Sequence, residues 1–260
     1  TFDAAHATLD RVETALPDAR LRTRIRYLLE RGRVYNTSGF TERASPLFRE
    51  AWELSRTLPA EGYYAVDAAH MLAIVGAPDE QIAWNQRGIE LAVASEDDRV
   101  RWWCAELSNN LGWTYSDMGE HKEALAWYEK ALEWREQREQ RGKERELRIA
   151  RWNIGRALRM LGRYDEALAL QRALLAEWEA SGVEQAGYVS EELGECLLAL
   201  HRADESRPHF AHAYTLLARD EWYREAQPER LARMKRLGET PDPSRGDGSS
   251  DRYGGSMPPV

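Results

Sequence analysis

The sequence has few of the residues and motifs on which catalysis or membrane insertion depends. It contains no run of about 18 apolar residues, so no membrane span is expected. It has no Walker loop, no His-Glu-x-x-His motif and no Gly-x-Ser-x-Gly motif. The Gly246–Gly248 segment does not lie between a strand and a helix, as a phosphate loop would. We therefore predict a protein that is not an enzyme and binds no cofactor.

Metal binding and disulfide formation are also poorly supported. His209 and His212 are three residues apart on a predicted helix, but no nearby Cys, Asp or His completes a ligand set, so no metal site is predicted. The two cysteines, Cys104 and Cys196, fall on predicted helices too far apart for a bridge. We expect both to be buried thiols.

The charge balance limits the partners. The formal net charge is −8 at pH 7, which argues against general nucleic-acid binding. No signal peptide is visible, so we predict a cytoplasmic protein, with a leader removed ahead of Thr1 as the open alternative. The hydrophobic content of 43% is enough for a sizeable core.

What the sequence does have is glycine at recurring positions inside predicted helices. A glycine in a helix interior costs about 1 kcal/mol relative to alanine. Its recurrence in one register, followed by the same side-chain types, therefore indicates a repeated packing requirement. These glycines are Gly32, Gly112, Gly155 and Gly194.

The register of small and aromatic residues resembles the tetratricopeptide repeat, a helix–turn–helix unit of about 34 residues. The fullest match has a helix glycine, an aromatic residue, a turn glycine, an alanine, a second aromatic residue and a second alanine. In chain order these are Gly112, Tyr115, Gly119, Ala124, Tyr128 and Ala131. The resemblance implies an all-α fold, a right-handed α-solenoid of antiparallel helix pairs.

We count a half repeat, five full repeats and a second half repeat, about twelve helices in all. The solenoid is assigned to residues 1–238, with full repeats near 25–61, 62–104, 105–147, 148–186 and 187–223 and half repeats at 2–16 and 228–238. The first half repeat has two open interpretations, a natural cap and the cut edge of a longer array.

The turn position recurs at steps of 37 to 43 residues, at Gly39, Gly76, Gly119, Gly162 and His201. We expect the additional residues to lengthen the helices. Long-helix repeats of about 40 residues look like those of kinesin light chains and of peptide-sensing bacterial regulators.

Residues 239–260 differ in composition from the rest of the chain. They are rich in glycine, proline and serine and carry almost no apolar residues, so they cannot bury enough surface to offset the entropy of ordering. We predict a flexible tail. Docking of Tyr253, Met257 and the prolines in a groove is the alternative.

By resemblance, the binding groove of such a solenoid is lined by the first helix of each repeat. The side chains that map there include tryptophan, tyrosine and arginine, which dominate binding hot spots. Arginine can also bind a carboxylate through two hydrogen bonds. The predicted groove residues are Arg26, Arg33, Asn36, Tyr63, His70, Asn109, Trp113, Trp152, Arg156, Arg159, Tyr188 and Glu191.

We therefore predict a non-enzymatic interaction scaffold that binds a protein segment or peptide with acidic and apolar side chains. Packing between repeats is the alternative role for Trp113 and, more strongly, for Trp152. A peptide- or metabolite-responsive sensor module of a larger regulatory protein is the alternative function. The sequence predicts no particular oligomeric state.

Overall fold

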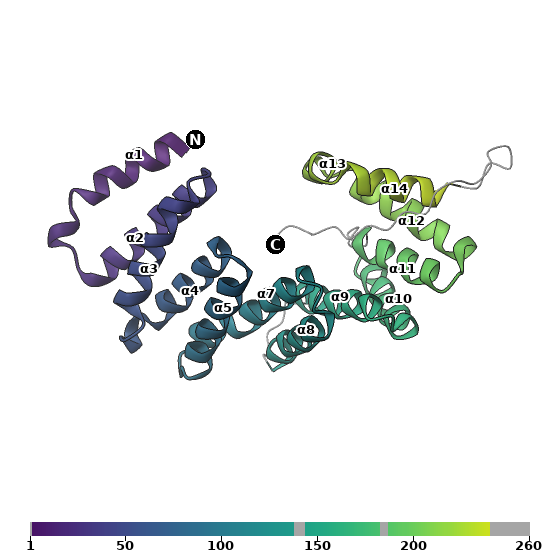
Figure 1. Cartoon of the computed structure of the whole chain (residues 1–260), viewed down its shortest axis with the longest axis horizontal. Coiled ribbons are helices and arrows are strands. Elements are labelled where there is room, and N and C mark those ends of the chain that lie inside the picture. The colour runs from purple at the N-terminus through teal and green to yellow at the C-terminus, as the bar shows by residue number, and fades with distance from the viewer. Residues whose placement is uncertain (1, 138–143, 183–186, 240–260) are drawn as a thin grey trace. The chain divides into compact units, whose positions relative to one another are not determined.

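Every regular element in the described residues is a helix. The computed structural model describes residues 2–137, 144–182 and 187–239 (Figure 1). The chain divides into two compact units, residues 1–139 and 140–260. The predicted tail lies outside the described residues from position 240 onward.

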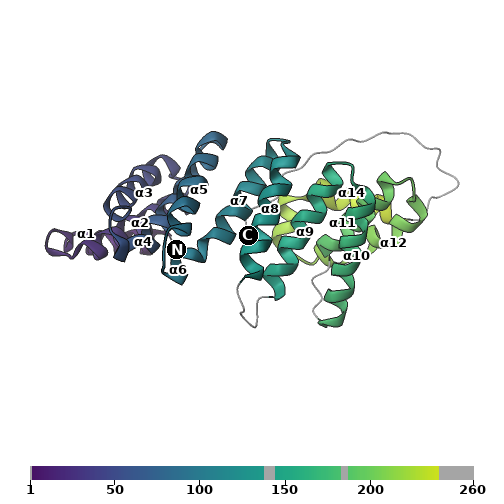
Figure 2. The same cartoon turned by 90° about the horizontal axis from the view of Figure 1, so that it is seen from below.

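The first unit is a series of antiparallel helix pairs in which α2 packs on α3, α4 on α5 and α7 on α8. Figure 2 shows α7 and α8 lying side by side. Two short 3₁₀ turns, Leu16–Asp18 and Pro59–Glu61, connect helices. The helices are α1 (Phe2–Glu13), α2 (Leu21–Thr37), α3 (Thr41–Ser55), α4 (Gly62–Val75), α5 (Pro78–Val93), α6 (Asp98–Arg101), α7 (Trp103–Asp117) and α8 (His121–Glu136).

The second unit repeats this arrangement, with α9 packed on α10, α11 on α12, and α14 against α12. Its helices are α9 (Glu144–Met160), α10 (Tyr164–Ala180), α11 (Gly187–Ala199), α12 (Ala203–Leu217), α13 (Glu221–Ala226) and α14 (Pro228–Gly238). Apart from the short helices α6 and α13, the described residues form the twelve helices that the repeat count predicts.

The interior glycines face buried side chains on the second helix of the same pair. A Cβ placed on Gly112 would lie 2.4 Å from the ring of Tyr128, and one on Gly32 would lie 2.4 Å from the ring of Phe48. Both rings are almost completely buried. Only glycine allows this approach, so the cost in helix propensity is offset by packing.

The turns use the left-handed backbone conformation that glycine adopts easily. Gly119 has a φ of +81°, and Gly39 and Gly162 are similar. His201, which replaces the turn glycine, also has a positive φ of 60°. Gly76 differs: its backbone is extended, with φ −85° and ψ 159°, and α5 then begins at Pro78.

The step from Gly76 to Gly119 also differs from the expectation that additional residues lengthen the helices. The additional residues form a connection between Val93 and Trp103 that contains α6. Asp97 caps this short helix, accepting a hydrogen bond of 2.9 Å from the backbone of Arg99, and Val100 is the buried residue of the helix. A cap and a single buried apolar side chain form a turn of helix that periodicity does not reveal.

The two cysteines agree with the sequence-based expectation. Cys104 on α7 and Cys196 on α11 are both buried and free of disulfide bonds. Burial, with the nearby charge of Glu192, raises the pKa of Cys196 to about 12. This thiol therefore stays protonated at neutral pH.

The Gly112–Tyr128 contact predicts the effect of adding one methyl group. Gly112→Ala should lower the free energy of unfolding by about 1–3 kcal/mol, because overpacking outweighs the gain of about 1 kcal/mol in helix propensity. Urea titration measures this. Gly62→Ala is the control, since its Cβ would lie 3.7 Å from the nearest side chain. A Gly112→Ala protein as stable as the wild type would contradict the packing explanation.

Candidate functional site

The first helices of the repeats carry polar contacts from one repeat to the next. Arg33 on α2 donates to Asp67 on α4, with Nη2 and Oδ2 2.6 Å apart. The Nδ2 of Asn110 on α7 lies 3.2 Å from the Nδ1 of His70 on α4. In both contacts the ninth residue of one repeat meets the sixth residue of the following repeat. Arg33 and His70, which are both predicted groove residues, are therefore already in contact with the first helix of the following repeat.

Aromatic rings accompany these contacts in the first unit. The ring of Trp103 lies 5.1 Å from that of His70 and 6.1 Å from that of Tyr63. Tyr63 is 38% exposed, whereas Trp103 is buried. Burial and the charge of Arg33 lower the pKa of His70 to about 4, against a smaller opposing effect of Glu106. His70 is therefore neutral at physiological pH.

The other predicted groove residues of the first unit lie on α2 and α7. Arg26 is exposed, and the side-chain oxygen of Asn36 accepts a hydrogen bond of 3.2 Å from Thr41. Trp113 is half-buried, with its ring 6.0 Å from that of Tyr128, and Asn109 is half-buried as well.

The second unit contains a cavity of about 660 Å³ between α9, α11 and α14, together with the two residues before α14. We call it the α9–α11–α14 pocket. Three of the predicted groove residues line it, namely Arg156, Arg159 and Glu191. The other lining residues are Met160, Glu192, Glu195, Ala226, Gln227, Pro228, Glu229, Arg230, Ala232, Arg233 and Arg236.

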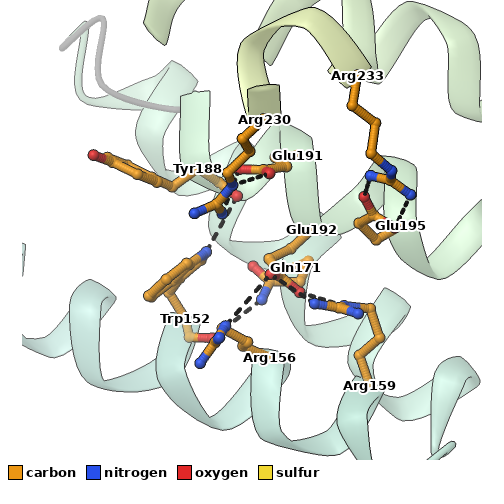
Figure 3. A network of polar contacts seen from close by, with 10 residues as sticks. All are labelled: Trp152, Arg156, Arg159, Gln171, Tyr188, Glu191, Glu192, Glu195, Arg230 and Arg233. Carbon is orange, nitrogen blue, oxygen red and sulfur yellow. Dashed lines mark hydrogen bonds and ion pairs between the residues drawn. The ribbon is translucent and has the colours of Figure 1, made fainter. Parts of the chain in front are cut away.

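Ion pairs join α11 to α9 and to α14 across the pocket (Figure 3). Arg159 on α9 donates to Glu192 on α11 at 2.7 and 3.1 Å, and the Nε of Arg156 lies 4.0 Å from the same carboxylate. On the other side of α11, Arg230 of α14 donates to Glu191 at 2.5 and 2.8 Å. The third pair joins Arg233 of α14 to Glu195, with Nη2 and Oε2 3.1 Å apart. The carboxylates thus come from α11, and the arginines come from its two neighbours.

Burial and attraction act against each other in these pairs. The side chains of Glu191 and Glu192 are only 5% and 2% exposed. Burial raises the pKa of Glu191 despite the charge of Arg230. At Glu192 burial acts in the same direction, but Arg159 and the other nearby arginines outweigh it and lower the pKa. Removing either partner would leave a buried charge without compensation.

Trp152 occupies a packing position between α9 and α11. It is 8% exposed, its Nε1 donates a 3.2 Å hydrogen bond to the carbonyl of Tyr188, and the two rings lie 5.9 Å apart (Figure 3). Its own carbonyl accepts a hydrogen bond from Gln171. These contacts correspond to the packing alternative for Trp152.

The sequence-based groove did not include the residues that α14 contributes. Arg230, Arg233 and Arg236 follow one another at intervals of three, which places them on one side of a helix. The predicted groove covers only the five full repeats and therefore excludes the half repeat that forms α14. The spacing of these arginines was the signal that could have identified them.

Other kinds of site find no support in the part of the chain that the structure describes. Within residues 2–137, 144–182 and 187–239, no group of three His, Cys, Asp or Glu side chains could hold a metal ion. The helices described there include none long and apolar enough to cross a membrane.

Comparison with known proteins supports the repeat assignment. Residues 103–180 match the family model described as tetratricopeptide repeat. No protein of curated function matches the chain significantly in sequence.

Solved structures match over most of the chain. BtubC (BKLC) from P. vanneervenii is 17% identical with a TM-score of 0.61, and the match covers 97% of each chain. The apo form of RapI is 16% identical with a TM-score of 0.60, over 91% of this chain and 90% of that chain. A Rap protein complexed with competence and sporulation factor is 16% identical with a TM-score of 0.58, over 87% of this chain and 62% of that chain.

Identities this low show the fold alone, and the fold is that of an all-α helical-repeat solenoid. The match at residues 103–180 identifies the repeat type of that segment as the tetratricopeptide repeat.

The neutral state of His70 predicts a pH dependence of stability. Folded His70 takes up a proton only near pH 4, whereas the unfolded chain does so near 6.5. The unfolded state therefore binds more protons between these values, and stability falls as the pH drops through this window. In His70→Gln, the fall between neutral pH and pH 4 should be smaller by up to about 3 kcal/mol. Urea titrations at both pH values test this, and identical losses in the two proteins would contradict it.

Proposed function

We propose that this chain is a non-enzymatic scaffold that binds a protein segment or peptide on the faces of its first helices. The α9–α11–α14 pocket is the observation that supports this most directly. It brings residues of three first helices to one cavity, and these include Arg156, Arg159 and Glu191 of the predicted groove. Its volume of about 660 Å³ is within the usual range for a ligand pocket.

The donors of the pocket favour an acidic group on the ligand. Arg159 binds Glu192 through Nε and Nη2, and Arg230 binds Glu191 through the same two nitrogens. The Nη1 group of each arginine makes no hydrogen bond to any described residue, and both side chains are 20% exposed. A guanidinium already held on one edge is oriented to receive a carboxylate on another.

Apolar side chains line the same cavity and favour a ligand that is acidic and apolar together. Met160 is 37% exposed, and Ala226, Pro228 and Ala232 lie beside the arginines. Burying apolar groups beside a charge-assisted contact gives both affinity and orientation. The ligand that fits this chemistry is a peptide segment in which acidic and apolar residues occur close together.

The pocket supports binding better than catalysis. Its described lining contains no Ser, Thr, Cys, His, Tyr or Lys side chain that could act as a nucleophile, and three of its glutamates are held in ion pairs with arginine. Function belongs to the site rather than to the fold, and the paired arginines and glutamates of this site favour binding.

A second candidate is a ligand-responsive sensor module. It is supported by the structural similarity to the Rap protein complexed with competence and sporulation factor. Small-angle scattering distinguishes the two functions. A sensor should change its radius of gyration when a selected peptide binds, whereas a rigid scaffold should not.

The scaffold function predicts which peptides bind and where. Peptides selected from a random display library should combine acidic and apolar residues. Arg156→Glu should weaken binding of a selected peptide by at least about tenfold, because the change places a negative charge beside the acidic group. Fluorescence anisotropy with the labelled peptide measures the affinity.

Arg172→Glu is the matched control, because Arg172 is exposed on α10 and does not line the pocket. It should leave the affinity unchanged. Arg156→Gln tests the site without adding a charge, and circular dichroism confirms that each variant is folded. Equal affinity in wild type and both Arg156 variants would show that the ligand does not bind in this pocket.

A further inference from the structure

The three ion pairs of the pocket differ in how deeply their carboxylates are buried. The side chains of Glu191 and Glu192 are 5% and 2% exposed, but that of Glu195 is 17% exposed. Its partner Arg233 is 24% exposed. The Glu195–Arg233 pair therefore lies where water and a ligand can reach it.

The pairs also differ in which nitrogens they occupy. Arg159 and Arg230 bind their glutamates through Nε and Nη2, which leaves Nη1. Arg233 instead binds Glu195 through both terminal nitrogens, Nη1 and Nη2. A carboxylate approaching the end of Arg233 needs these same donors, so Glu195 blocks it.

Arg233 has a second contact that keeps it in place. Its guanidinium carbon lies 5.9 Å from the centre of the Phe210 ring, which is completely buried in α12. A cation over an aromatic face is attracted to it independently of any carboxylate. Arg233 therefore stays at the pocket if Glu195 moves away.

We propose that Glu195 binds Arg233 in place of the ligand's carboxylate when no ligand is present. It occupies Arg233 in the unbound protein, and an acidic side chain of the bound segment displaces it into solvent. This inference rests on the proposed function, since it describes how the acidic group of the bound segment is recognised.

The exchange is feasible at this pair and not at the other two. One carboxylate replaces another on Arg233, so both hydrogen bonds are kept, and the displaced Glu195 is hydrated at the rim. Displacing Glu191 or Glu192 would leave a buried charge unpaired. The exchange also selects for acidic ligands. A ligand without a well-placed carboxylate would break the Glu195–Arg233 ion pair and put nothing in its place.

Glu229 provides a matched comparison on the same pocket. It lines the cavity and is exposed, and it forms no ion pair with any described residue. Glu229→Gln and Glu195→Gln change the charge of the pocket equally. Only Glu195→Gln releases an arginine.

The experiment measures binding of a fluorescein-labelled synthetic peptide composed of glutamate, leucine and alanine, with a lysine-for-glutamate peptide as its counterpart. Glu195→Gln should bind the acidic peptide about tenfold more tightly than the wild type, and Glu229→Gln only about twofold. Glu195→Asp keeps the charge but shortens the side chain. It should also bind more tightly, which separates release of Arg233 from a change of net charge.

Three outcomes would overturn the inference. The first is an equal gain in affinity for the acidic peptide in Glu195→Gln and Glu229→Gln. The second is a lower affinity in Glu195→Gln than in the wild type. The third is a gain in affinity in Glu195→Gln that stays the same when Arg233→Gln is added. In each of them the proposed function survives as long as Arg156→Glu still weakens binding. If the acidic peptide binds wild type and Arg156→Glu equally, or binds neither, both proposals fail.

Discussion

The close approach of the two helices within each repeat is the constraint on which the rest of the structure depends. A glycine on the first helix faces a buried ring on the second, as Gly112 faces Tyr128. Because this side of the first helix is committed to its partner, the next residue is rotated by about 100° toward the face that carries the polar contacts. The residues placed there by this geometry are Arg33, Trp113, Arg156 and Glu195.

The same close approach of the helices recurs in other repeats of the chain, but with different residues. Gly155 faces Gln171 rather than a ring, and a Cβ there would lie 2.3 Å from the amide nitrogen. In the second repeat the first helix has Ala69, and the glycine stands on the second helix instead, where a Cβ on Gly88 would lie 2.7 Å from Leu107 and 3.4 Å from Ala69. That repeat therefore matches the sequence pattern weakly although its helices pair normally.

The helices and their pairing could be predicted from the sequence because they depend on local periodicity and on glycine. The connection that contains α6 could not, because it depends on the cap at Asp97 and on the burial of one side chain, that of Val100. The ion pairs of the pocket could not be predicted either. Partners such as Glu195 and Arg233 are 38 residues apart, and the repeat register gives each side chain a face but not a neighbour. The function of the groove residues remains a prediction.

The order of charges along α9, α11 and α14 has a consequence for how such a chain can change in evolution. In a repeat protein each unit contacts only its neighbours, so the interface between neighbours decides which units can adjoin. Here the acidic helix stands between two basic ones, so losing residues 187–223 would bring arginine against arginine. A tandem copy of the same segment would bring glutamate against glutamate. These units look alike in fold, but the opposite sign of its charge means that α11 cannot be exchanged for α9 or α14 without losing these ion pairs.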